Sequence, residues 1–147
     1  MPEHTRQAVN AAQAEKAAEA WRGLRTLVLE QHDRRKEVST ALGMSFVRVK
    51  ALRWIAGAPL TMRELASHLQ TDAPYTTLVV DDLEKRDLVR REPHPADRRA
   101  KLVTVTAAGL AAAAVAEDIL NEPPPPLLAL DDGDLTALIR IIGRLQG

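Results

Sequence analysis

Residues 60–106 read LTMRELASHLQTDAPYTTLVVDDLEKRDLVRREPHPADRRAKLVTVT, and this stretch carries the strongest signal of the fold. It predicts a short apolar helix at 62–69, a polar break at 70–72 and a second helix at 73–86. Two β-prone runs then flank a basic loop at 93–99, which predicts a small hairpin. Two helices joined by a tight turn are typical of a helix-turn-helix, whose second helix is shaped for the DNA major groove; the basic hairpin would be its wing.

Both helices of this pair begin with strong capping signals. Thr61 and Glu64 have the spacing of a capping box. Asp72 can cap the second helix, and Pro74 stands in its first turn, where a missing N–H costs nothing. The residues that we expect to be buried in the second helix are Leu78, Val79 and Leu83. The residues that we expect on its exposed face, which are small, hydroxylated or aromatic, are Ala73, Tyr75, Thr76, Thr77 and Val80.

Composition excludes several classes of site. The chain has 147 residues, 46% of them hydrophobic but only 3% aromatic, so one domain with an aliphatic, largely helical core is expected. It has no cysteine, which excludes disulfides, thiolate metal sites and thiol-based redox sensing. No signal peptide or membrane span is evident, so we expect a cytoplasmic protein.

Charge is unevenly distributed, although the formal net charge is zero. Residues 44–106 carry 11 basic and 8 acidic side chains, whereas residues 107–147 carry 2 and 6. Within 85–101 there are 7 basic and 3 acidic side chains. Because phosphate binding depends on local positive potential, the hairpin region is a candidate contact with nucleic acid, and the acidic C-terminal third should face away from it.

The segments on either side also predict helices. A long amphipathic helix is expected at 8–38, with a break at 39–43. Ser45 can cap a helix at 46–56, and Thr106 one that runs to about residue 120. The apolar stripe of the first helix includes Trp21, Leu24 and Val28.

Four prolines at 123–126 predict a bend, after which Asp131 can cap a last helix. Its apolar stripe comprises Leu135, Leu138, Ile139, Ile142 and Leu145. Packing of the N- and C-terminal helices against a second chain is the simplest way to cover their apolar stripes, although packing on each other would also serve. The predicted fold is mainly α with a small β-hairpin (α+β): an N-terminal dimerisation helix (1–43), a winged helix-turn-helix (44–106) and C-terminal dimerisation helices (107–147).

At the wing the sequence resembles a known family. Residues 97–109, DRRAKLVTVTAAG, look like the wing signature of the MarR family of winged helix-turn-helix regulators: an acidic residue and Arg, an apolar strand, then Thr-x-x-Gly opening a helix. Residues 65–69 and 83–91 are similar to the family's helix-turn-helix helices and the strand that follows. One departure is Asp87, where the family usually has Gly; that place needs a left-handed backbone, which Asp tolerates.

The resemblance implies a homodimer that binds a palindromic DNA operator with its recognition helices in successive major grooves and its wings in the minor grooves. It places Arg99 in the minor groove, with Asp97 steadying it and Arg98 near phosphate; the other wing-support candidate is Lys101. The predicted DNA contacts are Arg63, Asp72, Ala73, Pro74, Tyr75, Thr76, Thr77, Val80, Arg98 and Arg99. The alternative interpretation is that the wing arginines are only solvated surface charges without a ligand.

Family members of this kind bind small aromatic or phenolic effectors, which implies a ligand crevice. Its candidate lining residues, which are core residues on the alternative interpretation, are Trp21, Met44, Phe46 and Trp54. The sequence has no paired histidines at metal-ligand spacing: His32, His68 and His94 are on different expected elements, so no metal and no cofactor are predicted. No catalytic constellation is evident, so an enzyme is not expected.

We therefore expect a DNA-binding transcriptional regulator, a repressor released from its operator by a small effector. The alternative is a winged-helix module that binds a partner protein through its acidic C-terminal surface and does not read DNA.

Overall fold

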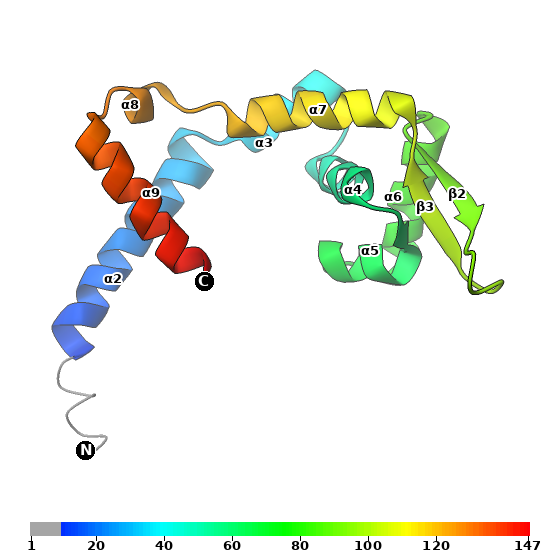
Figure 1. Ribbon diagram of the computed structural model, residues 1–147, viewed down its shortest axis with the longest axis horizontal. Coiled ribbons are helices and arrows are strands. Elements are labelled where there is room, and N and C mark those ends of the chain that lie inside the picture. The colour runs from blue at the N-terminus through cyan, green and yellow to red at the C-terminus, as the bar shows by residue number, and fades with distance from the viewer. Residues whose placement is uncertain (1–9) are drawn as a thin grey trace, which may run out of the picture.

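The computed structural model describes residues 10–147, and residues 8 and 9 of the first predicted helix lie outside that range. Within it, the chain forms an extended molecule with the winged helix-turn-helix at one end and two projecting helices at the other (Figure 1). Helices α3 (Arg34–Leu42) and α7 (Ala107–Asn121) join the two ends. The predicted class, mainly helical with a small sheet, is confirmed.

The winged helix-turn-helix follows the predicted order. Its helices and strands are α4 (Phe46–Gly57), β1 (Leu60–Thr61), α5 (Met62–Leu69), α6 (Ala73–Lys85), β2 (Val89–Pro93) and β3 (Lys101–Val105). The sheet has the order β1-β3-β2 and is antiparallel throughout, with Val89 opposite Val105 and Leu60 opposite Val103. The caps at Ser45, Thr61 and Asp72 all form as predicted.

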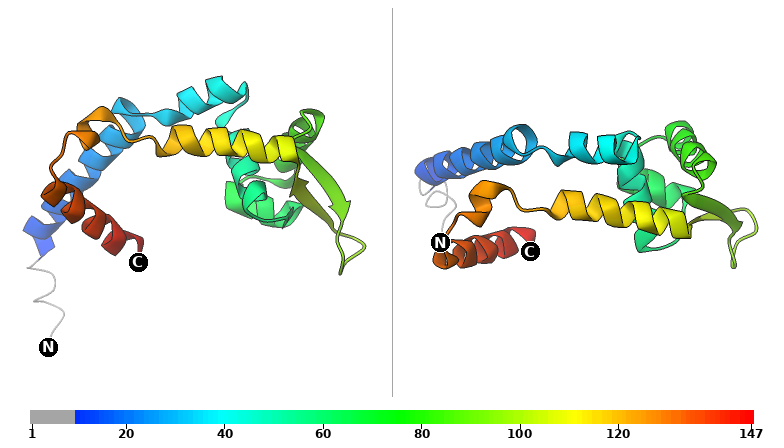
Figure 2. Two further views of the ribbon diagram at one scale, coloured as in Figure 1. Left: turned by 45° about the horizontal axis from the view of Figure 1, so that its top comes forward. Right: turned by 90° about the horizontal axis from the view of Figure 1, so that it is seen from above.

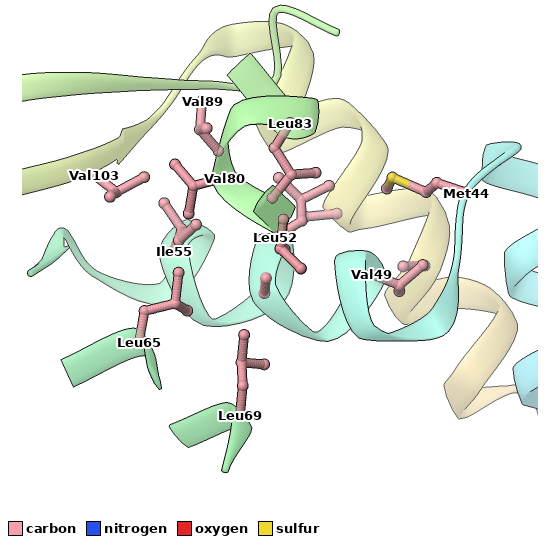
Figure 3. Close-up of a cluster of buried hydrophobic side chains, with 14 of the residues drawn as sticks. Met44, Val49, Leu52, Ile55, Leu65, Leu69, Val80, Leu83, Val89 and Val103 are labelled. Atoms are coloured by element: carbon pink, nitrogen blue, oxygen red, sulfur yellow. The ribbon is translucent and has the colours of Figure 1, made fainter. Parts of the chain in front are cut away.

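The core is aliphatic, as the composition requires. Leu52 and Ile55 of α4 lie at its centre, between Leu65 of α5, Leu83 of α6 and Val103 of β3 (Figure 3). The same cluster of buried side chains extends to the joining helices through Val38 of α3 and Ala113 and Ala116 of α7. Helices α3 and α7 are therefore packed into the core of the winged domain rather than standing apart from it.

The N-terminal segment departs from the prediction of one long helix. It consists of α2 (Asn10–Arg25), a π-helical turn η1 (Thr26–Gln31) and the separate helix α3. The break lies at His32 and Asp33, because the Asp33 carboxylate accepts a hydrogen bond from the Arg35 backbone N–H (2.9 Å) and starts a new helix. The predicted break at 39–43 is wrong except at Gly43, whose positive φ ends α3.

The C-terminal segment turns at the proline run, as predicted. After α7, the short helix α8 (Pro125–Leu128) takes two prolines in its first turn, and Asp131 caps α9 (Asp132–Gln146). Neither α2 nor α9 has a buried residue. They cross in the view of Figure 1, but the view from above in Figure 2 shows them as separate arms. None of the helices in residues 10–147 is long and apolar enough to cross a membrane.

The base of the wing is locked to the start of α7. Asp87 adopts the left-handed conformation that the sequence predicted (φ 59°), and its carbonyl accepts a hydrogen bond from the Thr106 hydroxyl (2.6 Å). The same hydroxyl oxygen accepts the Gly109 N–H (3.0 Å), and the Thr106 N–H donates to the Leu88 carbonyl (3.0 Å). Gly109 is required because a Cβ there would lie 2.0 Å from the Leu88 carbonyl oxygen.

Replacing Gly109 with Ala should therefore destabilise the fold by about 3 kcal/mol, at the upper end of overpacking costs, because backbone must shift. Gly23→Ala is the matched control: its Cβ would meet nothing within 4 Å in α2, and it should stabilise by up to about 1 kcal/mol. Urea unfolding at one protein concentration measures both. Equal midpoints for the two variants would contradict the close approach.

Candidate nucleic-acid interface

The side of α6 that is buried determines which of its residues remain exposed for a ligand. Val79 and Leu83 are buried as predicted, but the prediction that Thr76 and Val80 lie on the exposed face is wrong, since both are 0% exposed. Figure 3 shows Val80 pointing into the core. The prediction that Leu78 is buried is also wrong, since it is 56% exposed. The helix is therefore rotated about its axis relative to the predicted placement.

Thr76 is buried because the turn satisfies its hydroxyl. The hydroxyl donates to the Asp72 carbonyl (2.7 Å) and lies 2.8 Å from the Thr71 hydroxyl. Asp72 in turn accepts the Tyr75 N–H on its carboxylate (2.8 Å). Thr76 and Asp72 thus hold the turn between α5 and α6 and set the angle at which α6 leaves it.

The exposed face of α6 carries the remaining predicted contacts. Ala73, Pro74, Tyr75 and Thr77 are all exposed, and they surround the first turn of the helix. The Thr77 hydroxyl donates to the Ala73 carbonyl (3.0 Å), which leaves its lone pairs directed outward. With Leu78, these residues give α6 an outer face that is mostly apolar.

The wing is an ordered turn that presents two arginines. The Asp97 carboxylate accepts the Arg99 N–H (2.9 Å), and the Asp97 carbonyl accepts the Ala100 N–H (3.2 Å). Asp97 therefore steadies the backbone of the loop rather than a guanidinium. Arg98 and Arg99 are exposed, and neither side chain pairs with a carboxylate of residues 10–147. Lys101, also exposed, begins β3 opposite Pro93.

Arg91 ties the wing to α6, which the sequence did not reveal. Its guanidinium pairs with Asp81 and with Glu84 (3.2 Å), and its backbone N–H donates to the Glu84 carboxylate (3.1 Å). The acidic side chains of α6 are thereby neutralised on the side that faces the wing. Arg91 lies seven residues after Glu84 and ten after Asp81, across a turn, so helical periodicity in the sequence could not predict these ion pairs.

Asp82 ties α6 to the other side of the domain. It accepts hydrogen bonds from Arg86 Nε and Arg48 Nε, each at 2.8 Å. Arg86 also donates to the Gly43 carbonyl (3.1 Å), and Arg48 donates to the Ser45 hydroxyl (2.9 Å). The hydrogen bond from Arg86, helped by Arg48, holds the pKa of Asp82 below its ordinary value against the opposing effect of burial. The i, i+4 spacing of Asp82 and Arg86 was a usable signal in the sequence.

These pairs leave a distinct set of cations unneutralised. On the helix-turn-helix and the wing, six exposed side chains have no ion pair with any carboxylate of residues 10–147. They are Arg63, Lys85, Arg90, Arg98, Arg99 and Lys101. The arginines that hold the domain together are paired, so the free positive charge lies on the hairpin and the helix-turn-helix.

The four predicted pocket residues are not brought together. Met44 is buried in the core, and Trp54 stacks on His68 with ring centroids 3.9 Å apart. Trp21 is exposed on α2, and of the four only Phe46 lines an apolar cavity of about 440 Å³. That cavity lies where η1, α3, α4, α7 and α8 meet. Its apolar walls include Leu27, Val28, Leu120 and Leu127, and its polar rim includes His32, Arg34 and Glu122.

Within residues 10–147, no group of three or more histidine, aspartate or glutamate side chains is placed to hold a metal ion. His32 follows η1, His68 lies on α5 and stacks on Trp54, and His94 accepts the Ala96 N–H on its Nδ1 (3.0 Å). The described histidines therefore serve three unrelated parts of the fold.

Comparison with known proteins identifies the same architecture. Residues 42–100 match the sequence model of the MarR family. The fold is similar to that of the reduced form of MarR from E. coli (TM-score 0.70, 22% identity, 86% of this chain and 95% of that one). It is also similar to a mutant E. coli MarR complexed with operator DNA (0.63, 21%, 90% and 96%) and to an S. aureus MepR–DNA complex (0.60, 18%, 83% and 97%). No curated protein sequence matches the chain.

The ion pairs of Asp82 with Arg48 and Arg86 should make the stability of the fold depend on the protonation of Asp82. Because its folded pKa lies below the ordinary value of 3.8, its contribution is fully present above pH 3.8 and is lost as pH falls through the folded pKa. Asp82→Asn should lower the free energy of unfolding by about 0.5–1 kcal/mol at pH 7, and the difference from wild type should shrink at acid pH. Asp118→Asn, on the exposed side of α7, is the control. Thermal unfolding against pH at fixed protein concentration measures this; a constant difference would contradict it.

Proposed function

We propose that this chain is a member of the MarR family, whose sequence model matches residues 42–100, and that it is a transcriptional regulator that binds double-stranded DNA as a homodimer. The observation that carries this proposal is the separation of charge on the winged domain. The cations that hold α4, α6 and β2 together are paired with carboxylates, whereas the six exposed cations of the helix-turn-helix and wing have no carboxylate partner within residues 10–147. Unneutralised guanidinium and ammonium groups beside an exposed helix are what a phosphate backbone binds.

In the proposed complex, α6 enters the major groove and the wing reaches the adjacent minor groove. Arg99 would enter the minor groove, where negative potential is concentrated, with Arg98 near phosphate. Arg63 is proposed as a phosphate contact, and Tyr75 and Thr77 as contacts with base edges or phosphates. The fold neighbours complexed with DNA support this placement. Thr76 and Val80 are not proposed as direct contacts, because their side chains are buried.

The homodimer is supported by the two uncovered arms. Neither α2 nor α9 buries a residue in the single chain, yet each carries large exposed apolar side chains. On α2 they include Trp21, and on α9 Ile139 and Leu145 are each 71% exposed. A second copy is proposed to cover them, so that 1–43 and 107–147 provide the dimer and 44–106 the DNA-binding unit. Sedimentation equilibrium tests this: the measured mass should be twice the 16.1 kDa mass of the chain, and a monomer at micromolar concentration would refute the dimer.

The cavity of about 440 Å³ supports a further part of the proposal, release by a small effector. It lies between the arms and the winged domain, and Arg34 crosses it by donating to the Glu122 carbonyl at the end of α7 (3.1 Å). A small aromatic or phenolic molecule would fit its apolar walls and polar rim. By favouring one spacing of the two α6 helices, such a ligand would shift the population away from the DNA-binding state, and the protein would act as a repressor of a palindromic operator.

The central prediction concerns salt dependence. The purified protein should protect a palindromic segment of its own upstream region in a footprint, with affinity that falls steeply as salt rises. Arg98→Ala should weaken binding and flatten the slope of log affinity against log salt by about one unit, because Arg98 is the wing arginine placed near phosphate. Lys36→Ala removes one charge from the exposed side of α3 and should leave the slope unchanged.

Absence of binding to the upstream duplex at low salt would refute the proposed function. Equal slopes for Arg98→Ala and Lys36→Ala would refute the wing contact alone. A protein that ignores DNA but captures a partner protein would support a winged-helix interaction module instead.

The effector is tested on the same duplex with a panel of phenols and small aromatic acids. Compounds that bind the protein should lower its DNA affinity, and Leu127→Ala, which removes one apolar wall, should weaken that effect several-fold. Leu110→Ala, an exposed leucine elsewhere on α7, should not. A compound that binds in the cavity and leaves DNA affinity unchanged would contradict the release mechanism.

A further inference from the structure

The exposed face of α6 is mostly apolar and lacks the side chains that most often read guanine and adenine. Residues 73–84 contain no Arg, Lys, Asn or Gln. Those are the side chains that form paired hydrogen bonds with the major-groove edges of guanine and adenine. We propose that α6 reads the C5-methyl groups of thymine, so that the operator half-site is recognised through apolar contacts. This inference rests on the proposed function, which supplies the duplex.

Leu78 is the centre of that face. It is 56% exposed, one turn after Pro74 and three residues before Asp81, and it points away from the buried stripe of Val79, Val80 and Leu83. A leucine in the middle of a helix contributes its hydrophobic free energy only when another group removes it from water. No other group of residues 10–147 covers Leu78 in this way.

The acidic groups of α6 do not oppose an approaching duplex. Asp81 and Glu84 are held by Arg91, and the carboxylate of Asp72 is used to cap the helix. The charges of Asp81 and Glu84 are thus partly compensated, which lessens their repulsion of an approaching phosphate backbone.

A shallow hollow lies beside this face, between α5 and α6. It has a volume of about 330 Å³ and is lined by Met62 and Ala66 of α5 and by Ala73 and Thr77 of α6, with Arg63 at the same site. Its alanine, methionine and threonine methyl groups suit a methyl group of the ligand, and Arg63 suits an adjoining phosphate.

The occupant is identified by charge together with shape. Exposed cations precede and follow the apolar face in the sequence: Arg63 on α5, and Arg98 and Arg99 on the wing. None of these three is paired with a carboxylate of residues 10–147. A ligand that offers apolar groups between rows of negative charge is a duplex with thymine methyls in its major groove. An apolar protein surface would match Leu78 but not the cations.

The test uses two duplexes of about 30 base pairs, long enough for two half-sites one turn apart. They share one mixed A·T sequence, and one carries uracil at every thymine, so that only the C5-methyl groups differ. The full-length protein should bind the thymine duplex more tightly, by about fourfold for each methyl contacted. A G·C duplex should gain affinity when its cytosines are methylated at C5. Fluorescence anisotropy at low salt measures all four affinities.

The variant Leu78→Ala separates side-chain reading from the intrinsic shape of the duplexes. It should fold normally, because the side chain is exposed and Ala favours helix. It should lower the thymine-to-uracil affinity ratio by about fourfold for each methyl group that Leu78 contacts, whereas Leu110→Ala, a leucine of similar exposure on α7, should keep the wild-type ratio.

The outcomes distinguish this inference from the proposed function. Salt-dependent binding with equal affinity for thymine and uracil duplexes would overturn methyl reading and leave DNA binding intact. A ratio unchanged in Leu78→Ala would also overturn it, and would leave Leu78 as a contact for a protein partner. Failure to bind any of the duplexes at low salt would overturn both.

Discussion

The hydroxyl of Thr106 holds the parts of the winged domain in their arrangement. It joins the end of α6, through the Asp87 carbonyl, to the start of α7, through the Gly109 N–H, while the Thr106 N–H holds Leu88 at the base of the wing. The approach is so close that only glycine fits at position 109. Because α7 leads to α8 and α9, this junction connects the outer helices to the base of the wing.

The charges of the domain divide into two groups with different roles. Asp81, Asp82 and Glu84 of α6 are engaged by Arg91 of the wing and by Arg48 and Arg86 on the other side, which fixes α6 from both flanks. Arg98 and Arg99, in contrast, have no carboxylate partner within residues 10–147. A protein with a formal net charge of zero can therefore present a locally positive surface.

The outer helices α2 and α9 leave their apolar side chains exposed in the single chain. Helices in proteins owe most of their stability to a packed apolar face, yet α2 and α9 have no buried residue in the single chain. Joining helices α3 and α7 are different, because Val38 and Ala116 belong to the core of the winged domain. A dimer built on the arms would thus be continuous with that core, and the cavity beside Phe46 lies where the two parts meet.

Local features of the fold follow from the order of the residues alone. Caps at Thr61, Asp72 and Asp131 and the proline turn depend on neighbouring residues only, and the structure confirms each of them. The rotation of α6 depends instead on long-range packing, because Leu78 and Val80 are both apolar and only packing against α4 and the sheet selects which one is buried. Burial of Thr76 likewise required the hydroxyl of Thr71 and the carbonyl of Asp72 to satisfy it, and the Arg91 pairs required the wing to fold back on α6. Periodicity identifies the apolar side of a helix to within one neighbouring residue, whereas the face that meets a ligand depends on contacts between residues far apart in the chain.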